Sequence, residues 1–460
     1  MIGKSRKRAY VETYGCQMNI SDGELMEGIL ETHGYEIVTE PEEADIILVN
    51  TCAIREHAEK RVLGRVSQLC GLKRDNPDLI IGVTGCMAQR MGATLLERAP
   101  QVDLVMGPDG YRSLPDQLAA LVEGRKLRPS RSAKKRGPQL AILDLQLGEN
   151  YEGLDQRRSS SVSAWVPVQR GCDHRCTFCI VPYVRGPEKN RSPGEVLREI
   201  EGIADSGVTE VTLLGQTVNS YKAEGQSFPD LLRSVARVPG IRRVRFTSPH
   251  PNDVTADLLE VMAEEPAVCE QLHLPLQAGS DRTLRRMLRR YTVEAFFEKV
   301  DLARTVVPGI GLSTDIIVAF PGETRDEFEE TLEVLRRIRF DDAYTYRFSL
   351  REGTPATRFP PTDFISDEEG QKRLQRLIEV HRGIQAEINE AEVGRLERVL
   401  VEKEARGPGQ VLGRTRRNKV VAFAGSPELV GTYQEVRLTH TTGATFVGEL
   451  STAPASMGSA

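Results

Sequence analysis

Residues 171–179 read Gly-Cys-Asp-His-Arg-Cys-Thr-Phe-Cys and directly follow a strand-like stretch at 164–169. Three thiols, those of Cys172, Cys176 and Cys179, therefore lie within eight positions of the chain. Soft thiolates gathered so closely suit an iron–sulfur cluster or a zinc ion. Three thiolates hold three corners of a [4Fe–4S] cube and leave the fourth iron open, whereas a structural zinc needs a fourth ligand, such as His174. The ligand count of this cysteine loop favours the cluster, with zinc as the alternative.

Strand-like and helix-like segments alternate beyond the cysteine loop. The expected strands lie at 164–169, 209–214, 241–247, 271–276, 312–318 and 343–349. Amphipathic helical segments separate them, and such a series of crossings predicts a parallel sheet that is closed or partly closed into a barrel. Six strands are two fewer than a full eight-stranded barrel has. We therefore expect an incomplete (β/α)6 barrel whose lateral opening admits a macromolecular substrate.

A second set of cysteines is dispersed along the N-terminal part of the chain. Cys16, Cys52 and Cys86 each lie at or just past the end of an apolar strand-like run, with helical segments between the runs. The carboxyl ends of parallel strands share one edge of a sheet, so these three thiols are expected to converge there and hold a second cluster. The alternative is that free cysteines are often buried as small apolar residues. That is our interpretation of Cys70 and Cys269, which lack this context.

The pattern divides the chain, whose 460 residues are too many for one ordinary core, into several domains. After a long helical segment, short strands with Gly-rich turns predict a small all-β barrel. The expected organisation is a parallel α/β domain at 1–124, a basic linker at 125–161, the incomplete barrel at 162–393, the all-β barrel at 394–455 and a tail at 456–460.

Charge and hydropathy restrict the environment and the partners of the protein. No apolar run approaches the about 20 residues of a membrane-spanning helix, and no signal region follows the N-terminus, so we expect a cytoplasmic protein without a membrane partner. The net charge is −5, but basic residues gather at 125–136 and again at Arg414, Arg416, Arg417 and Lys419. Such patches suit contact with the phosphates of RNA, and the alternative is a solvated surface.

These motifs resemble the methylthiotransferases, a branch of the radical S-adenosylmethionine (SAM) enzymes, over nearly the whole chain. The cysteine loop is similar to the loop that defines the superfamily. Segments 14–19, 50–55 and 85–90 resemble motifs of the family's N-terminal domain, and segments 214–221 and 275–281 those of its radical SAM domain. The resemblance implies an N-terminal cluster domain, a central radical SAM barrel and a C-terminal RNA-binding barrel called TRAM.

The resemblance also implies a chemistry with two [4Fe–4S] clusters, held by the two cysteine sets, and two molecules of SAM. One SAM methylates a sulfur carried at the open iron of the N-terminal cluster. The other yields a 5′-deoxyadenosyl radical that abstracts hydrogen from C2 of an adenine, which then captures the methylthio group. An electron donor, such as a flavodoxin-type protein, and a sulfur source are implied as partners, and no catalytic residue beyond the cluster ligands is implied.

Several residues near the strand ends are candidates for contacts with SAM or substrate. The position of Phe178 is the one whose backbone faces the adenine of SAM in relatives, although ordinary packing explains this residue equally well. Gly215 and Gln216 end the second strand, where relatives contact the SAM amino group. The remaining candidates are Gln277, Ser280 and Asp315. A polar residue at a strand end is often only a cap or a turn residue.

The motif Gln17-Met18-Asn19 favours the branch that acts on N6-isopentenyladenosine at position 37, in the anticodon stem-loop of tRNA. Relatives that modify a ribosomal protein usually have Pro-Lys at the first two of these positions. Gly23, where a serine is usual, and residues 350–353 depart from the family pattern. The alternatives are a methylthiotransferase for threonylcarbamoyladenosine in tRNA or for a ribosomal protein, and a non-catalytic iron–sulfur sensor that binds RNA.

Overall fold

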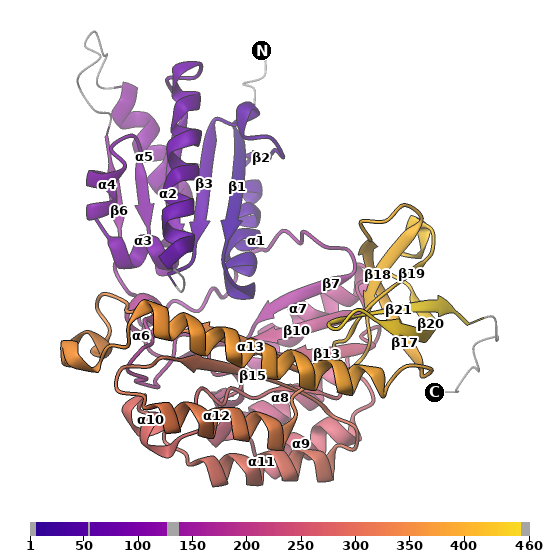
Figure 1. The fold of residues 1–460 in the computed structure, drawn as a ribbon. Helices are drawn as coiled ribbons and strands as arrows, with labels where there is room; N and C mark the ends of the chain where they lie inside the picture. The colour runs from indigo at the N-terminus through magenta and orange to yellow at the C-terminus, as the bar shows by residue number, and fades with distance from the viewer. Residues whose placement is uncertain (1–5, 54–55, 127–137, 452–460) are drawn as a thin grey trace. The chain divides into compact units, whose positions relative to one another are not determined.

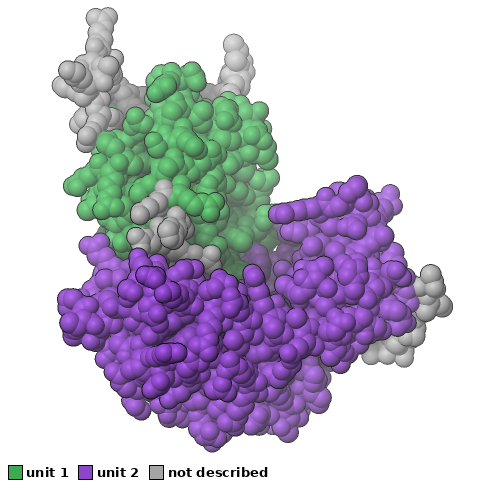
Figure 2. All heavy atoms as spheres, viewed as in Figure 1, with its two compact units in different colours: residues 1–159, 167–175, 179–191 green, residues 160–166, 176–178, 192–460 purple. Residues whose placement is uncertain are grey.

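The computed structural model describes residues 6–53, 56–126 and 138–451. The described chain forms two compact units, each presented by itself (Figure 2). Unit 1 comprises 1–159, 167–175 and 179–191, and unit 2 comprises 160–166, 176–178 and 192–460. Most of the basic run at 125–136 and the tail at 456–460 lie outside the described residues.

Unit 1 is built on a six-stranded parallel sheet in the order β2-β1-β3-β4-β5-β6 (Figure 1). Its elements are β1 (Arg8–Tyr14), α1 (Gln17–Thr32), β2 (Glu36–Ile37), β3 (Ile46–Thr51), α2 (Glu56–Gly71), β4 (Ile80–Gly85), α3 (Cys86–Met91), α4 (Thr94–Arg98), β5 (Leu104–Met106), α5 (Leu114–Lys126) and β6 (Leu140–Ile142). Strands β3 and β4 are buried along their whole length, because α1 and α5 cover one face of the sheet and α2 and α3 the other.

The stretch expected as a linker contributes the last strand of this sheet. Leu140 of β6 pairs in parallel register with Leu104 of β5. Further along, Tyr151 is buried in the apolar core of unit 1. Two segments that flank the cysteine loop belong to the same unit: β8 (Gln169–Arg170), before the loop, pairs antiparallel with β9 (Lys189–Asn190), after it. The short helix α6 (Val181–Val184) lies between the loop and β9 in the chain.

Unit 2 contains the six expected barrel strands. They are β7 (Ser163–Pro167), β10 (Glu210–Leu214), β13 (Arg243–Phe246), β14 (Gln271–His273), β15 (Gly311–Val318) and β16 (Asp342–Arg347). The strands form the sheets β13-β10-β7 and β14-β15-β16, and an isolated parallel bridge links Val244 of β13 to Val268, which shortly precedes β14 in the chain. Among the described residues no pairing joins β7 to β16, so the barrel is incomplete, as predicted.

Helices lie between consecutive barrel strands along the chain and cover the outer side of the sheet (Figure 1). They are α7 (Pro193–Asp205), α8 (Phe228–Ala236), α9 (Ala256–Glu264), α10 (Asp281–Arg286), α11 (Val293–Val306) and α12 (Arg325–Ile338). Their sequences explain them. In α12, for example, a capping box of Thr324 and Glu327 starts the helix, and Phe328, Leu332 and Leu335 form one buried stripe.

A long helix, α13 (Asp367–Glu390), leads to a closed five-stranded barrel in the order β17-β18-β19-β21-β20. The strands are β17 (Leu396–Glu404), β18 (Gln410–Arg414), β19 (Val420–Ala424), β20 (Tyr433–Thr441) and β21 (Thr445–Leu450). Alternate residues point inward, so that Val399, Val401, Phe423 and Phe446 meet in its core. The small β-barrel expected from the sequence is thus confirmed.

Candidate active site

The register of the unit 1 sheet brings the three N-terminal cysteines to one edge. Tyr14 of β1 pairs with Thr51 of β3, which pairs with Gly85 of β4, so the three strands end level. Cys52 and Cys86 follow immediately, and Cys16 is the N-cap residue of α1. We call Cys16, Cys52 and Cys86 the N-terminal cysteine set.

Tight backbone packing draws the members of this set close together. A Cβ added to Gly15 would lie 2.7 Å from Cβ of Cys52, so only glycine lets the turn before Cys16 approach that residue. Gly85 has a φ of +90°, and a Cβ there would lie 2.5 Å from the carbonyl oxygen of Thr51. Both glycines therefore serve the convergence of the cysteines that follow them.

The surroundings of the N-terminal cysteine set favour the thiolate at Cys16 and oppose it at Cys86. A hydrogen bond with Cys52 lowers the pKa of Cys16 to about 6, against the opposing effect of burial, and the positive charge of Arg185 adds to the lowering. Burial raises the pKa of the Cys86 thiol, while Arg185 opposes that shift. Three converging thiols, one of them already acidic, form a donor set that fits an iron–sulfur cluster.

The cysteine loop crosses the division between the units along the chain, since Cys172 and Cys179 belong to unit 1 and Cys176 to unit 2. In unit 1, the backbone N–H of Cys172 donates to Gly186 at 3.2 Å. In unit 2, Thr177 N–H donates to the carbonyl of Met287 at 3.1 Å, and Nη1 of Arg289 lies 3.5 Å from Sγ of Cys176. The loop is thus fixed by its backbone on both sides of Cys176.

Two of the candidate SAM contacts meet inside unit 2. The N–H of Gln277 donates to the backbone oxygen of Asp315 at 2.8 Å, and Gln277 has a φ of +69°. The buried Oε1 atoms of Gln277 and Gln216 have no hydrogen-bond partner among the described residues. Buried polar atoms are normally satisfied, so these two acceptors suit donors of a bound molecule. Gly215 is buried beside Gln216 at the end of β10.

The other two candidates are already engaged by neighbouring residues. The hydroxyl of Ser280 donates to Glu327 of α12 at 3.2 Å, so the structure does not bring it together with Gln277 and Asp315. The ring of Phe178 packs edge-on against Phe320 with 6.3 Å between ring centroids. Packing is therefore sufficient to explain the side chain of Phe178.

Sequence reasoning missed a polar ladder on the strands β14, β15 and β16. Nε2 of His273 lies 3.1 Å from Oδ2 of Asp315, and its Nδ1 lies 3.0 Å from Oγ of Ser313. The ring of Tyr344, which pairs in register with Asp315 and is 47% exposed, lies 5.7 Å from that of His273. The period of two along β15 places Ser313 and Asp315 on one face, which is the signal that could have found the ladder.

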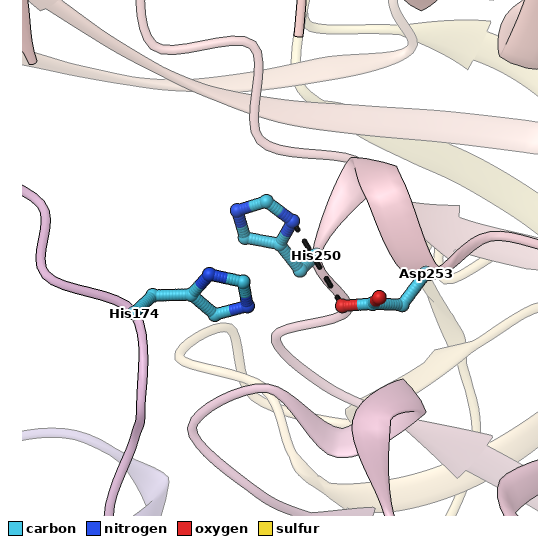
Figure 3. A group of neighbouring side chains, drawn as sticks. All are labelled: His174, His250 and Asp253. Atoms are coloured by element: carbon cyan, nitrogen blue, oxygen red, sulfur yellow. Dashed lines mark ion pairs between the residues drawn. The ribbon is translucent and has the colours of Figure 1, made fainter. Parts of the chain in front are cut away.

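A second histidine of unit 2 was not singled out either. His250 is buried, and its Nδ1 lies 3.9 Å from the carboxylate of Asp253 (Figure 3). The same Nδ1 accepts a hydrogen bond from the backbone N–H of Asn252 at 3.3 Å. Through this hydrogen bond His250 serves as the N-cap residue of the short 3-10 helix at Pro251–Asp253.

The four basic residues expected to contact RNA have protein partners in unit 2. Arg416 pairs with Glu270 at 2.8 Å, Arg417 with Glu392 at 2.7 Å, Lys419 with Asp341 at 2.7 Å and Arg414 with Glu402 at 3.2 Å. Three of these partners precede the β-barrel in the chain. Contact between these four residues and RNA stays a prediction. The observed ion pairs limit how far these side chains are available to phosphate.

Family models match three segments of the chain. The model of the uncharacterized protein family UPF0004 matches residues 8–107, that of the Radical SAM superfamily 166–335 and that of the TRAM domain 390–450. A tRNA-2-methylthio-N(6)-dimethylallyladenosine synthase of Carboxydothermus hydrogenoformans is 42% identical, over 95% of this chain and 97% of the relative. The synthase of the same name from Chlorobium limicola is 41% identical, over 97% and 98%.

The chain belongs to the tRNA-2-methylthio-N(6)-dimethylallyladenosine synthase family. It is therefore an enzyme chain with a radical SAM domain, and that superfamily implies SAM and a [4Fe–4S] cluster as cofactors. No helix among the described residues is both long enough and apolar enough to span a membrane.

Solved structures support the fold of this synthase family member. The radical SAM methyltransferase TsrM of Kitasatospora setae, solved with cobalamin and a [4Fe–4S] cluster, matches with a TM-score of 0.58 and 15% identity, over 89% of this chain and 81% of that one. The cobalamin-dependent SAM radical enzyme OxsB matches with a TM-score of 0.54 and 16% identity, over 82% and 56%. At these identities the likeness concerns the fold alone.

Proposed function

We propose that this enzyme attaches a methylthio group to C2 of the adenine in N6-isopentenyladenosine at position 37 of tRNA. The observation that carries the proposal is the convergence of Cys16, Cys52 and Cys86 at one sheet edge, in a chain that also holds the cysteine loop. Two thiol sets suit a reaction that needs both an activated C–H bond and a source of sulfur. The full-length relatives with the synthase name support the substrate.

Each thiol set has the ligand count for one cluster with an open iron. Cys172, Cys176 and Cys179 are assigned to the SAM-binding [4Fe–4S] cluster, and the N-terminal cysteine set to a second one. When bound, SAM and these clusters supply the radical chemistry and the sulfur-carrying site of the reaction. The proposed domains are a cluster domain at 1–124, a radical SAM domain at 162–393 and TRAM at 394–455. The segment 125–161 between the first two is more than a linker, since it supplies β6 and Tyr151 to unit 1.

The protein side chains bind and orient the reactants. Oε1 of Gln216 and Oε1 of Gln277 are suited to accept hydrogen bonds from the amino or hydroxyl groups of SAM, since both are buried without a partner among the described residues. The half-exposed ring of Tyr344, beside Asp315 and His273, offers a surface on which an unstacked adenine can stack. Gly215, Phe178 and Ser280 are assigned backbone or packing roles around them.

Contact with the tRNA anticodon stem-loop is assigned mainly to the TRAM barrel. Arg414 has the most exposed side chain of its four basic candidates, and its partner Glu402 is itself partly exposed, so phosphate can compete with that carboxylate. Arg416, Arg417 and Lys419 are more buried and hold other partners. We further propose a cytoplasmic location, because tRNA and a cellular reductant are both found in the cytoplasm. A flavodoxin-type electron donor and an external sulfur source are proposed as partners.

Nucleoside mass spectrometry tests this function. A bacterial strain that lacks its own synthase is complemented with this chain, and its tRNA is digested to nucleosides. The proposal expects 2-methylthio-N6-isopentenyladenosine to reappear. A methylthio product on threonylcarbamoyladenosine or on a ribosomal protein would instead identify one of the alternative substrates. Absence of 5′-deoxyadenosine from the reconstituted, reduced protein with SAM would identify a non-catalytic sensor.

A further inference from the structure

Arg185 lies six residues beyond Cys179 in the chain, yet its side chain reaches the N-terminal cysteine set within unit 1. It directly follows α6 and its side chain is only 2% exposed. Its Nε donates to Sγ of Cys86 at 3.1 Å, and its Nη2 donates to Oδ2 of Asp22 at 2.6 Å. A buried guanidinium therefore contacts both a proposed cluster ligand and a buried carboxylate.

One nitrogen of this guanidinium is unused. Nη1 of Arg185 is buried and has no hydrogen-bond partner among the described residues. Asp22, whose side chain is 1% exposed, already balances the charge of Arg185. A buried donor without a partner is costly, and native proteins rarely leave one. The remaining donor therefore suits a further acceptor beside Cys86, such as the sulfide of a bound cluster.

A rigid layer behind this ion pair fixes its position. The hydroxyl of Tyr151 lies 3.4 Å from Oδ1 of Asp22, and its ring stacks on that of Tyr111 with 5.9 Å between centroids. The guanidinium of Arg170 also lies 3.4 Å from the centroid of the Tyr151 ring and pairs with Asp109 at 2.8 Å. Because all of these groups are buried, Arg185 has little freedom to adopt another rotamer.

We propose that Arg185 is a positioning residue of the N-terminal cysteine set, which donates to Cys86 and to a sulfide of the cluster held there and so raises the reduction potential of that cluster. Hydrogen bonds and positive charge at cluster sulfurs stabilise the reduced form, which carries the additional negative charge. The inference rests on the proposed function, because it takes the second cluster to be bound by Cys16, Cys52 and Cys86.

A similar arrangement in unit 2 provides an internal comparison. Arg289 is buried, its Nη1 lies 3.5 Å from Sγ of Cys176, and its Nε has no partner among the described residues. Each proposed cluster site thus has one buried arginine in contact with one ligand sulfur. A change at Arg185 should affect the N-terminal cluster and spare the SAM-binding cluster, and a change at Arg289 should do the reverse.

The test uses the full chain with Cys172, Cys176 and Cys179 replaced by alanine, so that only the N-terminal cluster remains. In this background Arg185→Gln and Asp22→Asn are compared by redox titration, followed by electron paramagnetic resonance, with iron content and circular dichroism as checks. R185Q should lower the ratio of reduced to oxidised cluster at a fixed potential by about tenfold, which is about 59 mV for one electron. D22N should shift the potential the opposite way, because it leaves the charge of Arg185 unbalanced.

Arg373→Gln is the matched control, since Arg373 of unit 2 is also buried and ion-paired, with Glu323 at 2.8 Å, and none of its hydrogen bonds among the described residues goes to a cysteine. It should leave the potential unchanged even where it lowers stability. R185K should shift the reduction potential by an intermediate amount, because lysine keeps the positive charge but lacks the planar guanidinium that donates from several nitrogens. Equal potentials in the parent, R185Q and D22N would overturn the role of Arg185 while leaving the second cluster intact. If the parent bound no iron, both this inference and the proposed function would fail.

Discussion

Arg416 holds Glu270 through two nitrogens, with Nε and Nη2 each 2.8 Å from a carboxylate oxygen, and so joins the TRAM barrel to the radical SAM barrel. Buried Arg245 reinforces the junction by donating to the carbonyls of Thr415 and Arg416 at 2.8 Å. We call residues 414–419 the clamp segment. Arg416, Arg417 and Lys419 of this segment pair with residues that precede the barrel strands, which conflicts with the simplest interpretation of the basic run as a phosphate patch.

Replacing Arg416 with glutamine should therefore reduce stability more than RNA affinity. The loss of a half-buried bidentate pair should lower the free energy of unfolding by about 1 kcal/mol. Denaturant unfolding measures this loss, with the exposed cation Lys403→Gln as a control that should have no effect. Unchanged stability, together with a weaker salt dependence of tRNA binding, would instead show that Arg416 contacts phosphate.

The same junction should weaken in acid. Burial raises the pKa of Glu270, but the hydrogen bonds and the charge of Arg416 outweigh it, so the net pKa is below the ordinary 4.5. A depressed carboxyl pKa stabilises the fold above the unfolded-state pKa, and this contribution is lost as the pH falls through the folded-state pKa. The unfolding midpoint of the parent should exceed that of Glu270→Gln at pH 7, and the two should approach each other as the pH falls below the ordinary 4.5 and through the lowered pKa of Glu270. A constant gap would contradict the pairing.

Arg414 is expected to report on RNA contact. Its replacement by glutamine should lower the slope of log affinity for tRNA against log salt concentration by about one unit or slightly less, as for one lost phosphate contact. Fluorescence anisotropy at several salt concentrations measures the slope. Arg417→Gln, which removes a pair with Glu392 and Glu397, is the control that should keep the parent slope. Identical slopes for all three proteins would remove Arg414 from the RNA surface.

Gln216 and Ser280 should differ in their effect on SAM binding. Gln216→Ala removes a buried acceptor that has no protein partner among the described residues, so the Kd for SAM should rise about fivefold, as for about 1 kcal/mol. Ser280→Ala removes a hydroxyl that already donates to Glu327 and should leave this Kd unchanged. Equilibrium binding of SAM to the reconstituted protein measures both. If Ser280→Ala raised the Kd for SAM and Gln216→Ala did not, SAM would bind nearer to α12 than proposed.

The elements that the sequence predicted best are those with a regular period. The six barrel strands and the three level strands before Cys16, Cys52 and Cys86 follow from alternating apolar runs, because parallel strands must end on a common edge. The short strand expected around Leu140 to Leu145 is present as β6, but its three residues are too few to show a period, so the sequence did not predict that it joins the sheet of unit 1.

What the sequence did not predict depends on partners that are distant in the chain. Charges in the clamp segment are visible locally, but the acidic partner Glu270 is 146 residues away. Arg185 carries no motif signal of its own, since Asp22 and Cys86 precede it by 163 and 99 residues. Likewise, spacing alone does not tell that Ser280 faces α12 whereas Gln277 contacts Asp315.

The replacement of Cys16, Cys52 and Cys86 together by alanine tests the central claim most directly, through iron content, SAM cleavage and methylthiolation measured on one preparation. Cys70→Ala with Cys269→Ala is the matched control, because both thiols are buried, Cys70 in an apolar core of unit 1 and Cys269 in unit 2. The triple variant should keep about half of the iron, as one four-iron cluster of two, and should still form 5′-deoxyadenosine. It should form no methylthiolated tRNA, whereas the control should match the parent. Full iron content and full methylthiolation in the triple variant would contradict the two-cluster account.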